Sequence, residues 1–304
     1  MTHVFVTGGS GQTGPAVVAE LVASGHTVTG LARSATAAAR LEALGATPLR
    51  GCLDDLDSLR SGAEAADGVL HMAYGGDFSD LDDMMRRDRT AIQTLGQPLA
   101  HSGKPLVVTS GTLVMPAGRV TTENDAPDTA GIAAFRIAGE RACLDFAARG
   151  VRASVVRLAP TVHGPQDHGF IPMLIATART TGVSAYVGDG SNRWPAVHRL
   201  DAAILFRVAL EKAPAGSVLH GVAESGVTMK SIAETIARRL DLPTVSLTPD
   251  EAAGHYVNPF MAMVYGFDAP VTSAYTQQLL GWAPTHPTLL EDLEHGDYLT
   301  APAS

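Results

Sequence analysis

A strand-like run at residues 3–7 leads directly into the segment Thr7-Gly8-Gly9-Ser10-Gly11-Gln12-Thr13-Gly14, and an Ala- and Val-rich stretch follows. Glycine at Gly8, Gly11 and Gly14 lets the chain turn sharply out of a strand, lets a phosphate approach the backbone, and lets the next helix pack on the sheet. The free N–H groups and positive end of such a helix bind phosphate. The loop therefore predicts that the chain binds a dinucleotide pyrophosphate. The expected contacts are Gly8, Ser10, Gly11, Gln12, Thr13 and Gly14.

The first 160 residues alternate short β-branched runs with longer Ala- and Leu-rich stretches. Several of the short runs are almost wholly apolar, as in a parallel sheet covered by helices on both faces. Strands are expected at residues 3–7, 27–32, 47–51, 68–73, 105–110 and 152–158. Helices are expected at residues 13–24, 35–44, 79–102 and 133–149, with a short one from residue 55. This rhythm predicts an α/β fold with a Rossmann-like, doubly wound parallel sheet.

After residue 160 the pattern changes. Longer loops are expected at residues 161–169 and 188–198, strands become sparse, and helices gather toward the C-terminus. We therefore expect residues 1–160 to form a dinucleotide-binding Rossmann domain. Residues 161–304 are expected to form a smaller, mainly helical substrate-binding lobe, some segments of which return to the first domain.

The composition limits the partners. Hydrophobic residues make up 45% of the chain and charged residues 17%, which is typical of a folded globular protein. The net charge is −9 without any basic run, which argues against nucleic acid. No apolar stretch approaches the roughly 20 residues that span a bilayer, and no basic leader precedes the first strand. We expect a cytoplasmic protein with a small-molecule partner and no membrane contact.

The two cysteines, Cys52 and Cys143, are too few for a disulfide framework or a zinc site. Both lie in apolar surroundings and are expected to be core thiols. No metal site is expected.

The end of the second strand bears on the choice of cofactor. Enzymes that select NAD usually carry Asp or Glu there, to hold the ribose hydroxyls. This chain has Arg33, whose planar fork suits a 2′-phosphate, and Ser34 beside it. An Arg at a helix start can also simply face solvent, but the pattern favours NADP(H) over NAD(H). Just past the third strand, Leu53 and Asp54 are expected at the adenine, while Asp55 is the better helix cap.

Further motifs carry a resemblance to a known superfamily. They are HMA at residues 71–73, VVTSGT at 107–112, RLAPTVHGP at 157–165 and VGDGSNRWPAVHRLD at 187–201. With the glycine loop, they resemble the extended and atypical short-chain dehydrogenase/reductases, which include nucleotide-sugar epimerases and 3β-hydroxysteroid dehydrogenase-like reductases. The resemblance implies that Ala73 lines the cofactor and that Pro160, Thr161 and Val162 hold its nicotinamide end. It also implies a possible homodimer through the helices near residues 79 and 133.

The catalytic signature of that superfamily is a Ser or Thr near the fifth strand and a Tyr-x-x-x-Lys on the next helix. The Tyr transfers the proton, and the Lys lowers its pKa and holds the ribose. Ser110 or Thr112 can fill the first role. The position of the second motif is occupied by Ile132-Ala133-Ala134-Phe135-Arg136. Isoleucine cannot transfer a proton, and Arg136 could keep a ribose contact but is a poor proton donor.

Three explanations stay open. Another side chain could act as the acid, and the candidates are Tyr74, His163, His168 and Tyr265. The substrate could need little acid help, as an imine or an activated double bond does. The protein could also bind NADP(H) without chemistry.

The second lobe bears on the substrate. Where nucleotide-sugar enzymes place an Arg and then an Asp to hold the sugar nucleotide, this chain has Trp194 and Pro195, with Arg193 one place early. The change argues against a nucleotide sugar. Trp194 and Tyr265 are expected to wall an apolar substrate pocket, although packing between lobes explains Trp194 equally well. His198 and Asp201 are expected to anchor the second lobe.

The residues together predict an NADP(H)-dependent oxidoreductase. It would transfer hydride to a small or mid-sized, largely apolar carbonyl, imine or activated alkene, using a non-standard proton donor. The alternative is a catalytically silent NADP(H)-binding regulator or scaffold. A weaker alternative is an epimerase or dehydratase, which Ile132 and Trp194 disfavour.

Overall fold

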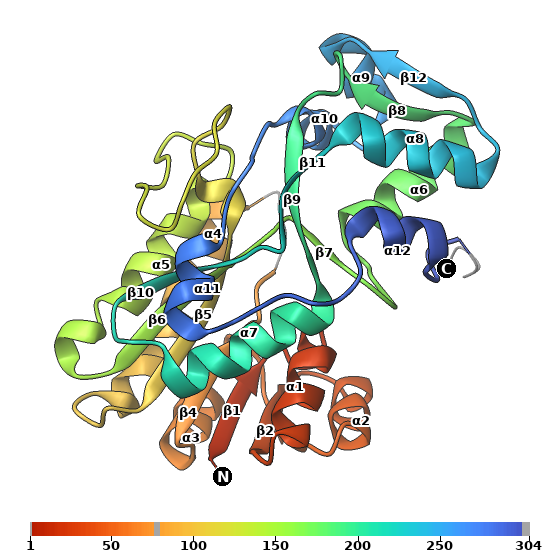
Figure 1. Ribbon diagram of the computed structural model, residues 1–304. Helices are drawn as coiled ribbons and strands as arrows, with labels where there is room; N and C mark the ends of the chain where they lie inside the picture. The colour runs from red at the N-terminus through yellow and green to blue at the C-terminus, as the bar shows by residue number, and fades with distance from the viewer. Residues whose placement is uncertain (1, 76–79, 300–304) are drawn as a thin grey trace.

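A seven-stranded, wholly parallel sheet organises the larger part of the molecule (Figure 1). The computed structural model describes residues 2–75 and 80–299. The strands run in the order β10-β6-β5-β4-β1-β2-β3. Their bounds are β1 (His3–Thr7), β2 (Thr27–Ala32), β3 (Thr47–Arg50), β4 (Gly68–His71), β5 (Pro105–Gly111), β6 (Arg152–Leu158) and β10 (Ser217–Gly221).

Helices cover both faces of this sheet. Because side chains alternate along a strand, Val4 and Val6 of β1 enter one core and Phe5 enters the other. The first core is closed by α1 (Gly14–Ala23), α2 (Ala35–Ala43), α7 (Arg199–Lys212) and α11 (Ala274–Leu280). The second is closed by α3 (Leu56–Ala65), α4 (Leu81–Gly96) and α5 (Ile137–Leu144). The predicted Rossmann-like fold class is confirmed.

Two of the expected helices are shorter than predicted. The expected helix at residues 79–102 is α4 followed by one 3-10 turn, η1 (Gln97–Leu99), and residue 79 lies outside the described residues. The expected helix at residues 133–149 is reduced to α5, with single 3-10 turns η3 (Ala134–Arg136) and η4 (Ala147–Arg149) at its two ends. Such turns commonly end α-helices. A further turn, η2 (Thr112–Val114), follows β5.

The smaller lobe contains more strand than the sequence predicted. One three-stranded sheet is formed by β7 (Thr161–His163), β9 (Arg193–His198) and β11 (Glu224–Thr228), and β8 (Ser184–Val187) pairs with β12 (Thr244–Leu247). The lobe helices are α6 (Phe170–Thr181), α8 (Met229–Leu240), α9 (Pro249–His255), α10 (Pro259–Gly266) and α12 (Leu289–His295). The loops expected at residues 161–169 and 188–198 are therefore shorter than predicted, because β7 and β9 occupy part of each.

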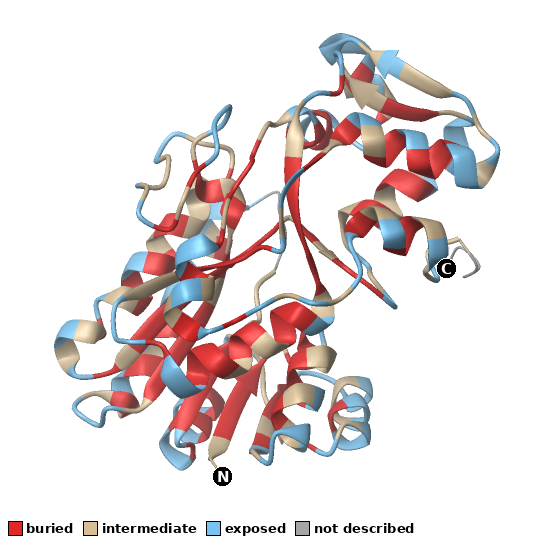
Figure 2. Ribbon diagram, in the orientation of Figure 1, coloured by how far each residue is buried: buried red, intermediate tan, exposed pale blue. Residues whose placement is uncertain are grey.

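The reason for this miss is visible in β9. It contains a proline, Pro195, which is uncommon inside a strand, yet the strand is buried along nearly all of its length (Figure 2). Pro195 stands opposite an irregularity in the pairing with β11, between Glu224 and Val227, and the pairing with β7 begins only at Ala196. A residue without an N–H costs little at such a point.

The chain passes between the two parts more than once. α7, β10 and α11 all follow residue 160, yet they complete the larger part. The lobe has its own core, which includes Trp194 and Ile236. The division at residue 160 into a dinucleotide-binding domain and a substrate-binding lobe stays a prediction.

Candidate functional site

The glycine loop connects β1 to α1 with the geometry that a phosphate loop needs. Gly8 has a φ of +76°, and a Cβ there would lie 2.5 Å from the backbone nitrogen of Ala73. A Cβ on Gly14 would lie 2.1 Å from the carbonyl oxygen of Gly8. A Cβ on Gly11 would have only that same oxygen nearby, at 3.3 Å, so its outer side is open. These are the three roles expected of the three glycines: a tight turn, close helix packing and an exposed backbone.

A pocket of about 700 Å³ opens over this loop. It lies outside the carboxyl ends of the strands, where the strand order reverses between β1 and β4. Open parallel sheets bind ligands at this point. The predicted cofactor residues on its wall are Gly8, Ser10, Gly11, Gln12, Thr13, Gly14, Arg33, Leu53 and Ala73.

Two predicted cofactor residues are engaged elsewhere. Ser34 caps α2, because its hydroxyl accepts a 3.1 Å hydrogen bond from the backbone of Ala37. Asp54 does not line the pocket. Its two oxygens accept hydrogen bonds of 2.7 and 2.6 Å from the guanidinium of Arg87. Asp55 caps α3 as expected.

Arg87 is a pocket residue that sequence reasoning missed. It comes from α4 and lines the pocket while it binds Asp54. Arg33, from the end of β2, lines the same pocket and forms no ion pair within residues 2–75 and 80–299. The two guanidinium groups give this pocket a positive wall. Cys52 also lines the pocket, so only Cys143 is the buried core thiol that was expected.

Unpartnered polar atoms gather at another part of the wall. Tyr74 and Thr109 line the pocket, and neither hydroxyl has a hydrogen-bond partner although both are buried. The guanidinium of Arg136 lies 3.4 Å from the centre of the Tyr74 ring. Its Nη2 donates to the carbonyl of Thr109 at 2.6 Å, and its Nη1 is buried and unpartnered. Buried polar groups without partners are costly, so their presence beside a pocket indicates a ligand.

The acidity of Tyr74 reflects two opposing influences. Burial raises the pKa of its phenol above the ordinary value, while the Arg136 guanidinium acts in the opposite direction. The phenol is therefore neutral near pH 7 and carries a proton that it can donate.

The two hydroxyls predicted for the fifth strand lie deeper than expected. Ser110 and Thr112 are both buried, their hydroxyls are unpartnered, and neither lines the pocket. Thr109 occupies the wall instead. A direct catalytic role for Ser110 or Thr112 stays a prediction.

A second pocket of about 160 Å³ adjoins the first at Gln12. Its wall includes Pro160, Thr161 and Val162, the residues predicted to hold the nicotinamide end. The rest of the wall comes from the loop before α6 and from the first turn of α6. These residues are Asp167, Gly169, Phe170, Ile171 and Met173. Sequence reasoning did not find them, because nothing local marks a loop or a helix start as a pocket wall.

The residues of the predicted aromatic wall lie away from both pockets. Trp194 and Tyr265 are buried in the core of the lobe and line neither pocket. Their rings pack at centroid distances of 5.3 and 6.1 Å from Phe170, which is the aromatic residue at the pocket. Tyr265 also donates to the carbonyl of Phe170 at 3.3 Å, and burial raises its pKa. Its role as an acid stays a prediction. Arg193 is bound through its side chain to Asp268.

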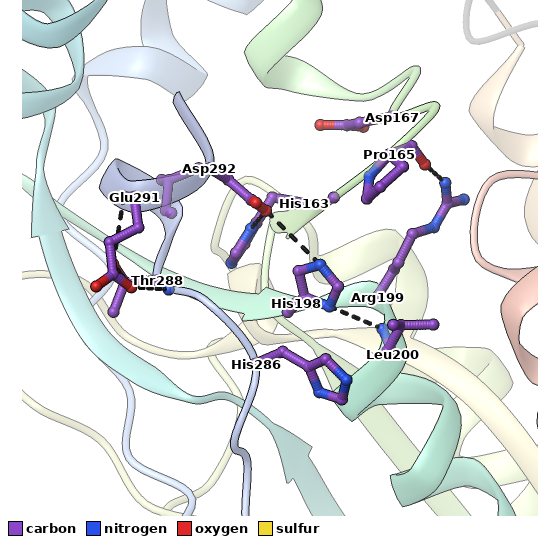
Figure 3. Close-up of polar contacts among 12 residues, drawn as sticks. His163, Pro165, Asp167, His198, Arg199, Leu200, His286, Thr288, Glu291 and Asp292 are labelled. Carbon is purple, nitrogen blue, oxygen red and sulfur yellow. Dashed lines mark hydrogen bonds and ion pairs between the residues drawn. The ribbon is translucent and has the colours of Figure 1, made fainter. Parts of the chain in front are cut away.

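The remaining acid candidates lie outside both pockets. His163 is buried, and its Nδ1 is 2.5 Å from an oxygen of Asp292 (Figure 3). His168 is exposed and touches Gln12 only through its backbone. His198 caps α7 and stacks on His286 at 4.9 Å.

Asp201 holds the segment that leads to α12. It accepts backbone hydrogen bonds from Thr285 and His286 at 3.0 and 3.1 Å. These contacts agree with the anchoring role expected of His198 and Asp201.

Within the described ranges no group of three His, Cys, Asp or Glu side chains is arranged to hold a metal ion. No described helix is long and apolar enough to cross a membrane.

Fold and site together define a nicotinamide-dinucleotide-binding protein of the Rossmann class. The model of the NAD dependent epimerase/dehydratase family matches residues 4–220, and the chain belongs to that family. This membership confirms the resemblance to extended short-chain dehydrogenase/reductases. The chain is an oxidoreductase of this type.

The chain is also similar to individual proteins. An uncharacterized protein of Schizosaccharomyces pombe is 47% identical over 97% of this chain and 99% of its own. The 4-hydroxy-2-methyl-3-oxo-4-farnesyl-3,4-dihydroquinoline-1-oxide ketoreductase of Stigmatella aurantiaca is 27% identical over 83% of this chain and 79% of its own. Among solved structures, a dTDP-glucose 4,6-dehydratase of Streptomyces venezuelae with NAD bound has a TM-score of 0.78. It is 18% identical over 97% of this chain and 95% of its own, so it is similar in fold.

Proposed function

We propose that the chain is an NADP(H)-dependent reductase of a small or mid-sized, largely apolar carbonyl, imine or activated alkene. The observation that carries the proposal is the buried, unpartnered hydroxyl of Tyr74 on the pocket wall, with Arg136 against its ring. The glycine loop and the open side of Gly11 fit a dinucleotide pyrophosphate. A bound nicotinamide supplies hydride.

Tyr74 is the proton donor in this proposal. When hydride adds to a carbonyl carbon, the π electron pair moves to oxygen, and that oxygen takes the phenol proton. The phenolate left on Tyr74 is stabilised by the positive charge of Arg136, and solvent returns the proton. Arg136 thus takes the charge-stabilising part of the superfamily's Lys, and Tyr74 takes the part of its Tyr from a different element.

Two arginines support NADP(H) over NAD(H). Arg33 has no acidic partner within the described ranges, and a 2′-phosphate would provide one. Arg87 adds a second positive charge on the same pocket wall. The related dehydratase was solved with NAD, so the preference has to be measured directly.

The smaller pocket is the proposed place for the apolar part of the substrate. Val162, Phe170, Ile171 and Met173 make its wall largely apolar, and it adjoins the residues proposed at the nicotinamide. A dry cavity of about 150 Å³ in another protein accommodates benzene, so a volume of about 160 Å³ suits a ring or a short alkyl chain.

Binding without turnover is the second candidate. It is favoured by Ile132, which packs against the core of the lobe where a proton-donating Tyr was expected. An epimerase or dehydratase acting on a nucleotide sugar is the weaker alternative. It is disfavoured because Trp194 is buried and the Arg193 side chain is held by Asp268.

The test is NADPH oxidation, followed by absorbance, with ketones, enones, imines and a UDP-sugar. We expect turnover with an apolar ketone or enone. In Tyr74→Phe, loss of the proton donor should lower kcat by about 10²–10⁴-fold. The NADPH dissociation constant of this variant should stay close to the wild-type value. Tyr275→Phe, at an exposed tyrosine on α11, is the matched control and should behave as the wild type.

Two outcomes would count against the reductase. Tight NADPH binding without turnover across the whole panel would favour the binding-only candidate. A Tyr74→Phe variant with wild-type kcat would remove Tyr74 as the donor.

A further inference from the structure

The loop at residues 164–169, between β7 and α6, has no regular structure of its own. Gln166 has a φ of +61°, a left-handed conformation that is uncommon for a residue with a side chain. A loop of this kind depends on its neighbours to hold one geometry. Because Asp167 and Gly169 line the smaller pocket, those neighbours also determine the shape of that pocket.

One neighbour is the glycine loop. The side-chain amide of Gln12 donates to Asp167 Oδ1 and accepts a 2.9 Å hydrogen bond from the backbone of His168. Arg199, at the start of α7, donates to the carbonyl of Pro165 (Figure 3) and to that of Gln12. Gln12 lines both pockets. Gln12, which is expected at the pyrophosphate, is therefore held in place by the loop at residues 164–169 and by Arg199.

The other neighbour is the C-terminal segment after α12. The hydroxyl of Tyr298 donates to Asp167 Oδ2 at 2.6 Å and accepts from the backbone of Gly164 at 3.2 Å. The backbone of Gln166 donates to Asp297 at 3.3 Å. Burial and the Asp167 charge both raise the pKa of Tyr298, so its hydroxyl remains a donor.

Asp167 thus connects the glycine loop with the C-terminal segment, because Gln12 donates to one of its carboxylate oxygens and Tyr298 donates to the other. Hydrogen bonds to a charged carboxylate are stronger than those between neutral groups. α12 is held at a second point by the contact of Asp292 with His163. The C-terminal segment and the glycine loop are therefore connected through the side chain of Asp167.

We infer that Tyr298 is a positioning residue for dinucleotide binding, which it supports by holding Asp167 against Gln12. This inference rests on the proposed dinucleotide site. A dinucleotide on the glycine loop stabilises the arrangement of loop 164–169 and the C-terminal segment, and these segments in turn stabilise the bound dinucleotide. Such coupling is reciprocal. Cofactor binding therefore also stabilises the wall of the smaller pocket, to which Asp167 and Gly169 belong.

The test is hydrogen exchange of the full chain with and without NADP⁺, together with the NADP⁺ dissociation constant. In the wild type, NADP⁺ should slow exchange at residues 8–14, at 164–169 and at 289–299. In Tyr298→Phe, protection should persist at 8–14 and be lost at the other two segments. The dissociation constant should rise about three- to ten-fold, a part of what a hydrogen bond to a charged group contributes.

Asp167→Asn is the second variant. It keeps the size of the side chain and weakens both hydrogen bonds, so it should show the same loss of protection even if Tyr298→Phe folds poorly. Tyr275→Phe is the control and should retain the wild-type pattern.

Two contrary results are distinguishable. Protection of residues 8–14 alone in the wild type, or unchanged protection and affinity in both variants, would overturn the coupling and leave the dinucleotide site intact. No NADP⁺ protection at residues 8–14 in the wild type would overturn the site and the coupling with it.

Discussion

At the scale of single residues, Arg33 and Arg87 line the same pocket but differ in whether the guanidinium has an acidic partner. Arg87 already has both oxygens of Asp54 as partners. Arg33 is exposed and forms no ion pair with any described residue. A phosphate that enters this pocket would gain most from the guanidinium that is free. Arg33 is therefore the residue at which cofactor preference should be tested.

We expect Arg33→Ala to raise the NADPH dissociation constant by about ten- to a hundred-fold, because a hydrogen bond to a charged group contributes roughly 1.5–3 kcal/mol. The NADH constant should change much less, since NADH lacks the 2′-phosphate. Arg40→Ala is the control. It removes the same charge from an exposed position on α2, away from the pocket. Fluorescence titration measures both constants. Equal losses for NADPH and NADH in Arg33→Ala would contradict the preference for NADP(H).

Residues such as Gly8 and Arg33 were predictable because their roles depend on a few neighbours in the chain. Arg87 was not, because it is 33 residues from its partner Asp54 and no local pattern connects them. The same holds for Asp167, which is 155 residues from Gln12. Side-chain contacts at such separations depend on how the elements pack.

At the scale of elements, the start of α1 is the most constrained point of the site. A Cβ at Gly14 would lie 2.1 Å from the Gly8 carbonyl and 2.6 Å from the Gly9 backbone. Backbone atoms cannot move aside as a flexible side chain can. We expect Gly14→Ala to lower the free energy of unfolding by about 1–3 kcal/mol, as overpacking does. The same displacement should weaken NADPH binding by about ten-fold or more, because the phosphate loop moves.

The matched control is Gly254→Ala on α9. No atom lies within 4 Å of a Cβ at that position. Its stability should be unchanged or higher, because Ala is favoured over Gly within a helix by roughly 0.5–1 kcal/mol. Urea unfolding and an NADPH titration of both variants provide the comparison. Wild-type stability and affinity in Gly14→Ala would contradict the packing argument.

Among the elements, the strands of the parallel sheet were the most predictable. β1, β2 and β6 have the predicted bounds, because a strand buried on both faces is almost continuously apolar. β9 was missed, because its proline and the polar residues before it are typical of a loop. Its strand conformation follows from its pairing with β7 and β11. The sequence could not show these partners, which lie in separate parts of the chain.

At the scale of the whole molecule, histidines join the two parts around Asp292 and Asp201. His163 comes from β7, His198 ends β9 and caps α7, and His286 comes from the segment before α12 (Figure 3). The rings of His198 and His286 are stacked, and those of His163 and His198 meet edge to face. The burial of His198 near these two carboxylates makes the junction of the two parts sensitive to pH.

His198 should therefore make stability fall as pH falls. Burial lowers its pKa from 6.5 to about 4, with Asp292 and Asp201 opposing the shift and His163 and His286 adding to it. The unfolded chain takes up this proton near pH 6.5, but the folded chain does so only near pH 4. The group's contribution is thus present above pH 6.5 and is lost progressively as pH falls to 4. At pH 5 the loss from this group is about 1–2 kcal/mol relative to neutral pH.

His198→Asn removes the titrating ring and keeps an acceptor for the helix-capping hydrogen bond from Leu200. Urea unfolding at neutral pH and at pH 5 should show a decline in stability that is about 1–2 kcal/mol smaller than in the wild type. His101→Asn is the control, because His101 is exposed and its left-handed backbone suits Asn. Its decline should equal that of the wild type, since the substitution leaves the junction around Asp292 and Asp201 unchanged. If the His198→Asn variant declines as much as the wild type and the His101→Asn control, the acid sensitivity of this fold does not arise at His198.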